Sequence, residues 1–305
     1  MSLMISIYTV ILNYNNYEDT KECIDGIKRI QLPDGYINNV IMVDNCSTDN
    51  SGKKLQQLYN GTITYLQSDM NYGYAAGNNI GIKYALTQKA DYICVLNNDT
   101  VADEDFLSPC IAVLKEYSDI AFISPTIENF CDDLVQSTGG DIFFSKGLVT
   151  VKNNGTKRSN LPKQIESDYI GGACLIFKSN LVEKIGLIPE NYFLFFEETE
   201  WCWKAKLNGM RNICLTTTAI KHKGSATIDA VDGLHAYMME RNRVVFLKRN
   251  APSRLVYMSA IIFLTFKYIK KGIMESHAYF NYLQYMNDGR KNRVDNKYPF
   301  VYIRK

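Results

Sequence analysis

The chain has 305 residues, of which 46% are hydrophobic and 22% charged, and its net charge is +2. A chain of this kind can bury a sizeable core as one large domain or two small ones. Its first residues lack the basic, apolar and small-residue series of a secretion signal, and its eight cysteines include no Cys-x-x-Cys pair. Both features argue against a secreted, disulfide-linked protein, so we expect a cytoplasmic one.

The charge is unevenly distributed. Residues 248–305 contain twelve Lys or Arg and three Asp or Glu, a local charge of +9, whereas the first 247 residues carry −7. The acidic body argues against nucleic acid as a partner. The basic end indicates either a surface for an anionic partner or an ordinary solvated face, and charge alone favours neither.

The first 125 residues alternate short β-branched runs with longer helical patterns. The expected strands are 5–12, 40–44, 62–67, 92–96 and 120–124, and the expected helices are 18–30, 53–59, 75–88 and 103–117. This alternation predicts an α/β fold with a mostly parallel central sheet and helices on both faces. Ligands of such sheets bind at the carboxyl ends of the strands.

The pattern changes after about residue 130. We expect a hairpin over 141–151, a polar loop over 152–166, a buried run over 173–177, a helix over 179–186, an aromatic stretch over 192–196, a helix over 198–208, a strand over 210–217, and helices over 233–248 and 253–272.

Three of the expected strands end in polar residues, namely Asn13-Tyr14-Asn15, Asp44-Asn45 and Asn97-Asn98-Asp99. In a parallel sheet these ends share one crevice. Amides and a carboxylate there can bind a nucleobase and ribose, and a second carboxylate can hold Mg²⁺ or Mn²⁺ on a diphosphate. Each segment alone is explained as well by turn formation, but the three together are less easily explained that way.

Seven segments then occur in a recognisable order. They are VILNYN at 10–15, VDNCSTD at 43–49, NYGYAAGNN at 71–79, LNND at 96–99, GGACLI at 171–176, FFEETE at 195–200 and HKGS at 222–225. This series resembles the successive signatures of family 2 glycosyltransferases, most closely the bacterial rhamnosyltransferase-like group. The resemblance covers residues 5–248.

The resemblance implies a GT-A fold, the fold of nucleotide-diphospho-sugar transferases. Residues 1–128 would be the half that binds the nucleotide-sugar, and residues 129–248 the half that binds the acceptor and carries catalysis. Residues 249–305 lie beyond the resemblance, and their charge and apolar run predict a basic, partly amphipathic helical extension.

The resemblance also assigns donor and metal residues. Asp44 would contact the base or ribose, in a pocket bordered by Asn13, Asn15 and Asn45, and Asn97 and Asn98 would lie beside the donor. Asp99 would bind Mg²⁺ or Mn²⁺, and His222 would complete that site. Asn97 replaces the first aspartate of the family's acidic element, so we expect weaker metal affinity. Lys221 and Lys223 would add positive charge for the phosphates.

Gly73, Gly77 and Asn78 lie where a strand gives way to a helix. Glycines there allow the backbone close to a ligand, which would make this a donor-binding segment. Close packing between helix and strand, with asparagine capping, explains the same residues equally well.

Glu197 and Glu198 are the candidate catalytic residues. Apolar rings at 192–196 precede them, and burial beside such rings disfavours the charged form of a carboxylate. Glu198 aligns with the family's catalytic aspartate and would remove the acceptor's hydroxyl proton. The alternative is that both merely complement a helix dipole. Tyr237, Arg241 and Asn242 resemble a family patch that would close over the diphosphate.

The apolar run 255–266 lies between Arg254 and Lys267 and is too short to span a bilayer. Together with later basic residues it fits either an amphipathic region at the inner membrane face, near a lipid-linked acceptor, or a helix packed on the catalytic domain.

The predicted function is therefore inverting, non-processive, metal-dependent transfer of a sugar from dTDP-rhamnose or a UDP-sugar to a saccharide acceptor, in bacterial cell-surface polysaccharide synthesis. The alternatives are a sugar-nucleotide pyrophosphorylase, which would need a glycine-rich loop after the first strand, and a non-catalytic nucleotide-sugar-binding protein.

Overall fold

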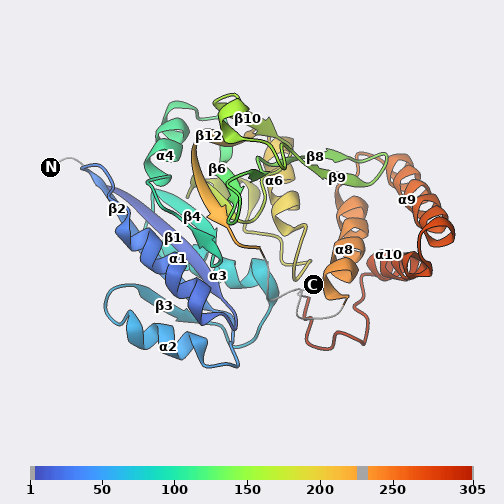
Figure 1. The fold of residues 1–305 in the computed structure, drawn as a ribbon, viewed down its shortest axis with the longest axis horizontal. Coiled ribbons are helices and arrows are strands. Elements are labelled where there is room, and N and C mark those ends of the chain that lie inside the picture. Colours follow the sequence, from blue (N-terminus) through green and yellow to red (C-terminus); the bar gives the residue numbers. More distant parts are fainter. Residues whose placement is uncertain (1–3, 225–232, 304–305) are drawn as a thin grey trace.

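The computed structural model of the protein describes residues 4–224 and 233–303. A twisted central sheet lies between two layers of helices, and a group of C-terminal helices stands at one side (Figure 1). The strands are β1 (Ile5–Asn13), β2 (Tyr36–Asp44), β3 (Thr64–Gln67), β4 (Tyr92–Asn97), β5 (Thr100–Val101), β6 (Ile120–Asn129), β7 (Val135–Ser137), β8 (Gly140–Phe143), β9 (Leu148–Val151), β10 (Gln164–Ser167), β11 (Cys174–Lys178) and β12 (Arg211–His222).

The helices connect and cover these strands. They are α1 (Tyr17–Arg29), α2 (Ser51–Leu58), α3 (Gly73–Thr87), α4 (Leu107–Glu116), α5 (Leu181–Ile185), α6 (Glu197–Leu207), α8 (Leu234–Asn250), α9 (Arg254–Met274) and α10 (Asn281–Lys291), with short 3₁₀ turns η1 (Arg158–Asn160) and η2 (His277–Phe280). The fourth helix begins at Leu107 and not at 103, because the Asp105 carboxylate accepts hydrogen bonds from the first free amides, those of Leu107 and Ser108.

The main sheet has the order β10-β12-β6-β11-β4-β1-β2-β3. Strands β3, β2, β1 and β4 are mutually parallel, whereas β11 runs antiparallel between β4 and β6. The amino end of β11 therefore lies at the same edge as the carboxyl ends of its neighbours. Helices α1, α2 and α4 bury apolar side chains on one face of the sheet, and α3, α5 and α6 do so on the other. The predicted mostly parallel sheet, covered on both faces, is confirmed.

Strand β12 is longer than predicted and runs on to His222. Its last two residues pair with the two-residue strand β5. This pairing places His222 opposite Thr100, the residue that follows Asp99. A contact between segments so far apart in the chain depends on tertiary structure, so the local sequence pattern does not reveal it.

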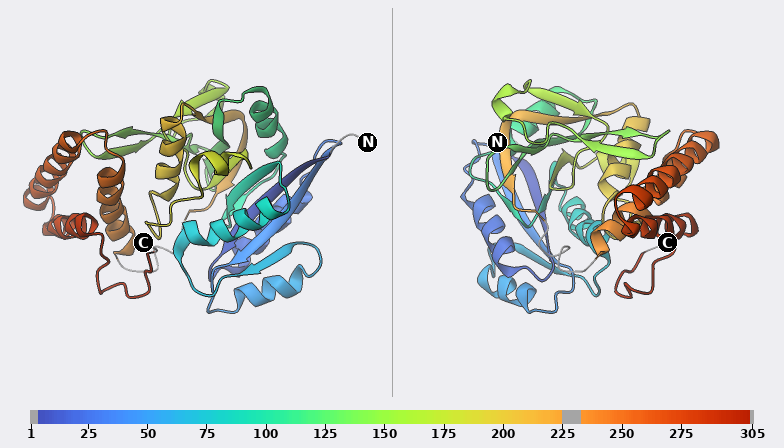
Figure 2. Two further views of the ribbon diagram at one scale, coloured as in Figure 1. Left: turned by 180° about the vertical axis from the view of Figure 1, so that it is seen from behind. Right: turned by 45° about the vertical axis from the view of Figure 1, so that its right-hand side comes forward.

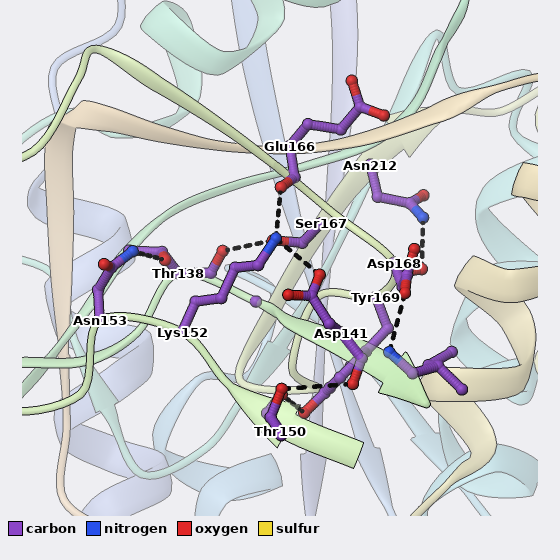
Figure 3. Close-up of polar contacts among 12 residues, drawn as sticks. Thr138, Asp141, Thr150, Lys152, Asn153, Glu166, Ser167, Asp168, Tyr169 and Asn212 are labelled. Atoms are coloured by element: carbon purple, nitrogen blue, oxygen red, sulfur yellow. Dashed lines mark hydrogen bonds and ion pairs between the residues drawn. The ribbon is translucent and has the colours of Figure 1, made fainter. Parts of the chain in front are cut away.

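The predicted polar loop over 152–166 is only partly a loop, because it contains η1 and leads into β10, which pairs with β12. Its start is fixed by Lys152, whose Nζ lies 2.7 Å from an Asp141 carboxylate oxygen and donates to the Glu166 carbonyl at 2.9 Å (Figure 3). The Asp168 carboxylate accepts a 2.8 Å hydrogen bond from the Ile142 amide. The hairpin β8–β9 is thus anchored at its base and held to the sheet.

The C-terminal helices form a layer of their own beyond α6 (Figure 2). Phe246 of α8, Leu264 of α9 and Met286 of α10 belong to one buried apolar cluster with Tyr192 and Phe196. The turn of the β8–β9 hairpin reaches this layer, where the Ser259 hydroxyl donates to the Ser145 carbonyl. Within the described residues, none of the helices combines the length and the apolar character that crossing a bilayer requires.

Candidate active site

Asp44, at the carboxyl end of β2, is buried and held from several sides. One of its oxygens accepts from Asn13 Nδ2 at 2.8 Å and from the Ser47 hydroxyl at 2.6 Å, and the other accepts from Gln67 Nε2 at 3.0 Å. Asn13 is also fully occupied, because its amide group contacts Ser51 and its oxygen accepts from Thr20. We therefore expect Asn13 to orient Asp44 rather than to touch a donor itself.

Asn15 and Asn45 flank this carboxylate. Asn15 adopts a positive φ of 51°, and its side chain bonds to the backbone and hydroxyl of Thr48. Asn45 donates to Asn71 and to the Gly73 carbonyl, while its buried Oδ1 has no hydrogen-bond partner in the described part of the chain. A buried acceptor without a donor is costly, so Asn45 Oδ1 is a candidate contact for a ligand N–H or hydroxyl.

Gly52 is a residue of this region that motif analysis did not single out. A Cβ built there would lie 2.3 Å from Cγ of Asp44. We predict that Gly52→Ala displaces Asp44 or helix α2, with a loss of stability of about 1–3 kcal/mol and weaker binding of nucleoside diphosphates. Thermal unfolding and calorimetric titration measure both effects. The control is Gly26→Ala, also in a helix, where the nearest atom would be 3.4 Å away; equal behaviour of the two variants would contradict the prediction.

Gly73 and Gly77 pack against protein atoms. A Cβ on Gly73, which has φ +86°, would lie 2.1 Å from the Phe193 carbonyl oxygen, and one on Gly77 would lie 2.5 Å from Leu12. Both positions favour the packing explanation over direct donor contact. Asn78 is different: its amide donates to the Tyr74 carbonyl, but its buried Oδ1 has no hydrogen-bond partner among the described residues.

Asp99 and His222 come together through the β5–β12 pairing. Oδ1 of Asp99 lies 3.1 Å from Nε2 of His222, and neither buried atom has a hydrogen-bond partner in the described residues. Nδ1 of His222 lies 2.8 Å from Oε1 of Gln136 on β7. An Nδ1–H that donates to Gln136 leaves Nε2 facing a carboxylate oxygen, and this contact is stabilised either by a proton on Nε2, which makes an imidazolium–carboxylate ion pair, or by a metal ion that both atoms bind.

This pair therefore fits a divalent metal ion, for which imidazole and carboxylate are both suitable ligands. No group of three or more His, Cys, Asp or Glu side chains in the described residues could hold a metal. The remaining ligands would have to come from other groups, as a donor diphosphate can supply. Sequence analysis did not single out Gln136, because its contact with His222 depends on the pairing of β7 with β6.

Asn97 and Asn98 extend from the end of β4. Asn98 donates to the Thr20 hydroxyl at 2.8 Å, and Asn97 Nδ2 and Oδ1 make no hydrogen bond to described residues, which leaves Asn97 the more available of the two. The two lysines expected to meet phosphates are paired instead. Lys223 contacts Asp19, and Lys221 lies 2.7 Å from Asp133, so the predicted phosphate role of both lysines is not supported.

Three glutamates begin α6 and differ in protonation. Burial and the neighbouring Glu198 raise the pKa of Glu197 well above its ordinary value. Burial also raises the pKa of Glu198, to about 7. For Glu200, burial opposes ionisation, but hydrogen bonds from Arg249 and Tyr192 lower its pKa. Only Glu198 is thus both partly exposed and poised to change charge near neutral pH.

The backbone before α6 is strained. Phe193, Phe195 and Phe196 have φ between 68° and 76°, a region that non-glycine residues seldom adopt. Asn242 of α8 stabilises this turn, because its Nδ2 lies within 2.6–3.1 Å of the carbonyls of Tyr192, Leu194 and Phe195. Tyr237, Arg241 and Asn242 are fully buried and bonded to protein groups, so the expectation that they close over the diphosphate is wrong.

We predict that Asn242→Ala lets this turn relax and misplaces Glu198. The expected result is a kcat lower by about 10²-fold with a donor KM changed less than about threefold, because the residues expected to bind the nucleotide lie on other elements. Steady-state kinetics separate the two constants. Asn208→Ala, at the other end of α6, is the matched control. An unchanged kcat in a folded Asn242→Ala protein would contradict the positioning role.

These groups meet at one edge of the sheet. The Asn97 amide donates to the Ala173 carbonyl just before β11, and the Tyr74 hydroxyl donates to the neighbouring Gly172 carbonyl. The Tyr74 amide donates to Phe193, beside the glutamates. The Asp44 carboxylate, the Asp99–His222 pair and Glu198 thus lie along one sheet edge, where a glycosyltransferase with the GT-A fold is expected to carry its site.

The comparison with known families agrees. The family described as glycosyl transferase family 2 matches residues 8–185, which is more than half of the chain, and the chain belongs to this family. The predicted family, fold and enzyme class are confirmed.

Individual relatives cover most of the chain. Low-salt glycan biosynthesis hexosyltransferase Agl10 of Haloferax volcanii is 28% identical over 248 residues, 79% of this chain and 75% of that one. The dTDP-rhamnosyl transferase RfbF of Shigella flexneri is 20% identical over 277 residues, 85% of each chain. The crystal structure of GalNAc-T7 with UDP, GalNAc and Mn²⁺ shares the fold, with a TM-score of 0.60 at 14% identity over 93% of this chain. The chain spans 56% of that longer protein.

Proposed function

We propose that the protein is an inverting, non-processive glycosyltransferase that moves a sugar from a nucleotide diphosphate to a saccharide acceptor during cell-surface glycan synthesis. The observation that carries the proposal is the convergence of Glu198, with a pKa of about 7, and the unpartnered Asp99–His222 pair at one sheet edge. A transferase needs a base on the acceptor side and charge compensation on the diphosphate side; Glu198 can act as the base, and the Asp99–His222 pair would hold the cation that compensates the charge.

In this proposal Asp44, oriented by Asn13, binds the ribose or base, and Asn45 and Asn97 lie beside the donor. The ionised Glu198 removes the proton of the attacking acceptor hydroxyl while the bond from the anomeric carbon to the diphosphate breaks. Burial and the neighbouring Glu198 raise the pKa of Glu197, which favours its neutral form. Asp99 and His222 would hold Mg²⁺ or Mn²⁺, which when bound neutralises the charge that develops on the leaving diphosphate.

The donor class is proposed from the relatives. RfbF is named as a dTDP-rhamnosyl transferase, and GalNAc-T7 was crystallised with UDP and Mn²⁺, so dTDP-rhamnose and UDP-sugars are the donors to test first. We also propose a cytoplasmic location, with the C-terminal segment on the inner membrane face near a lipid-linked acceptor.

Donor hydrolysis in the absence of acceptor tests the proposed reaction. We expect slow release of dTDP or UDP from one of these donors with Mn²⁺ or Mg²⁺, and loss of this release in EDTA. Thermal unfolding with each nucleoside diphosphate and Mn²⁺ identifies the matched base independently, because only a bound ligand stabilises the fold. A panel that gives neither hydrolysis nor stabilisation would refute the proposed donor class. Undiminished hydrolysis in EDTA would refute the proposed metal dependence.

A further inference from the structure

Helix α9 has two apolar faces, and only one of them is covered by the protein. Ala260, Leu264 and Tyr268 are buried against α8, the β8–β9 hairpin and α10. On the opposite face Leu255, Ile262, Phe266 and Ile273 are 82%, 51%, 67% and 73% exposed. Figures 1 and 2 place α9 at the outer edge of the C-terminal layer.

The exposed residues form a continuous stripe. Leu255, Met258, Ile262, Phe266, Ile269 and Ile273 follow one another at spacings of three or four residues, the repeat of one helix face. From the first to the last, this α9 stripe is roughly 27 Å long at 1.5 Å per residue. Phe263 and Met274 widen it on one side. Contiguous exposed apolar surface is characteristic of an interaction site.

The charges beside the stripe select the partner. Arg254 and Lys270 are exposed along α9 and form no ion pair with any described residue, and Glu275, the acidic side chain at the end of the helix, is paired with Lys271. A helix with apolar residues on one face and unpaired basic residues at its margin complements an anionic bilayer surface. A second copy of the chain placed on the same face would bring like charges together.

We propose that the α9 stripe docks the protein on an anionic membrane, with α9 lying in the plane of the interface. The packed face of α9 fixes the helix to α8, whose residue Asn242 holds the turn before Glu198. The catalytic domain would therefore be held at the membrane by a rigid connection. The inference rests on the proposed function in one respect only: that function explains why the acceptor would be at the membrane.

The test is co-sedimentation of the full chain with vesicles of phosphatidylcholine containing about 30% phosphatidylglycerol. We expect binding that falls with salt and is weak on pure phosphatidylcholine. Leu255→Gln/Phe266→Gln/Ile273→Gln removes apolar contact and should weaken binding at least about tenfold. Ile37→Gln/Leu58→Gln/Leu207→Gln is the matched control: its three sites are 42–66% exposed on the catalytic domain, and it should bind within about threefold of wild type.

A second pair of variants tests the charge argument. Arg254→Gln/Lys270→Gln should bind anionic vesicles more than about tenfold less tightly, at about fivefold per basic side chain, whereas Lys83→Gln/Lys184→Gln should bind like wild type. Thermal unfolding confirms that each variant is folded.

Unchanged binding by the apolar triple variant would overturn the proposal. A second result would also overturn it: the wild type is a dimer in solution and binds no vesicles, and the triple variant is a monomer. The stripe would then be a contact between two copies. Donor hydrolysis measured without vesicles is independent of these outcomes. If the wild type bound vesicles but hydrolysed no donor, the proposed reaction would be refuted and the membrane contact would stand.

Discussion

Replacement of Glu198 by Gln is expected to lower kcat by about 10²- to 10⁴-fold, the usual contribution of a general base. Gln has nearly the shape of Glu but cannot accept a proton at neutral pH. Because burial raises the pKa of Glu198 to about 7, the wild-type rate should also depend on pH. The base works only when deprotonated, so kcat should rise with pH and be about tenfold higher at pH 8 than at pH 6.

The control for this prediction is Glu197→Gln. Glu197 is buried and its pKa is raised well above its ordinary value, which favours the neutral acid, and an amide is of similar size and also neutral. We expect kcat within about tenfold of wild type and an unchanged pH profile. In the wild type, the contribution of Glu197 to stability should fall as the pH increases above about 4.5, because the unfolded Glu197 ionises there and the folded one does not. If Glu198→Gln kept kcat within about tenfold, Glu198 would not be the base.

Replacement of Asp99 by Asn is expected to weaken Mn²⁺ binding at least ~100-fold, the upper range seen for loss of even an indirect metal contact. Asp99 supplies the only carboxylate in the Asn97-Asn98-Asp99 segment, so its replacement by an amide would leave this strand end without negative charge. Calorimetric titration of Mn²⁺ in the presence of UDP or dTDP measures the affinity directly. Donor hydrolysis should fall in parallel and recover in part at high Mn²⁺ concentration.

Asn97→Asp is the opposite change and restores an acidic residue two positions earlier. The Asn97 side chain makes no hydrogen bond to described residues, so a carboxylate can be introduced without breaking a contact. We expect tighter Mn²⁺ binding than in the wild type. Equal Mn²⁺ affinity in Asp99→Asn and the wild type would exclude Asp99 as a ligand, whatever the activity of the two proteins.

Much of the fold is predictable from local patterns. β-Branched runs and helical periodicity identify β1, β2, β4, β6 and the helices between them, and the parallel arrangement follows from their alternation. The shared edge of Asp44 and Asp99 follows from the same rule. The roles of individual residues in binding and catalysis remain predictions.

The rest depends on contacts between distant segments. Asn13 orients Asp44 and is not free to bind a ligand, because its side chain is also hydrogen-bonded to Ser51 and Thr20. Neither of these two residues belongs to the sequence motif that contains Asn13. The role of Gln136 follows from the pairing of β7 with β6, and that of Asn242 from the packing of α8 against the turn at 192–196. Such assignments require the tertiary structure, because no local periodicity encodes them.

The antiparallel strand β11 has a consequence for the modular use of this enzyme. It comes from the second half of the chain but pairs over five residues with β4 of the first half, and Cys94 and Cys174 lie side by side there with sulfur atoms 3.9 Å apart. A fragment of residues 1–128 would therefore expose the edge of a buried strand, which invites aggregation. Hybrid enzymes that combine one donor half with another acceptor half should keep β11 with its original β4.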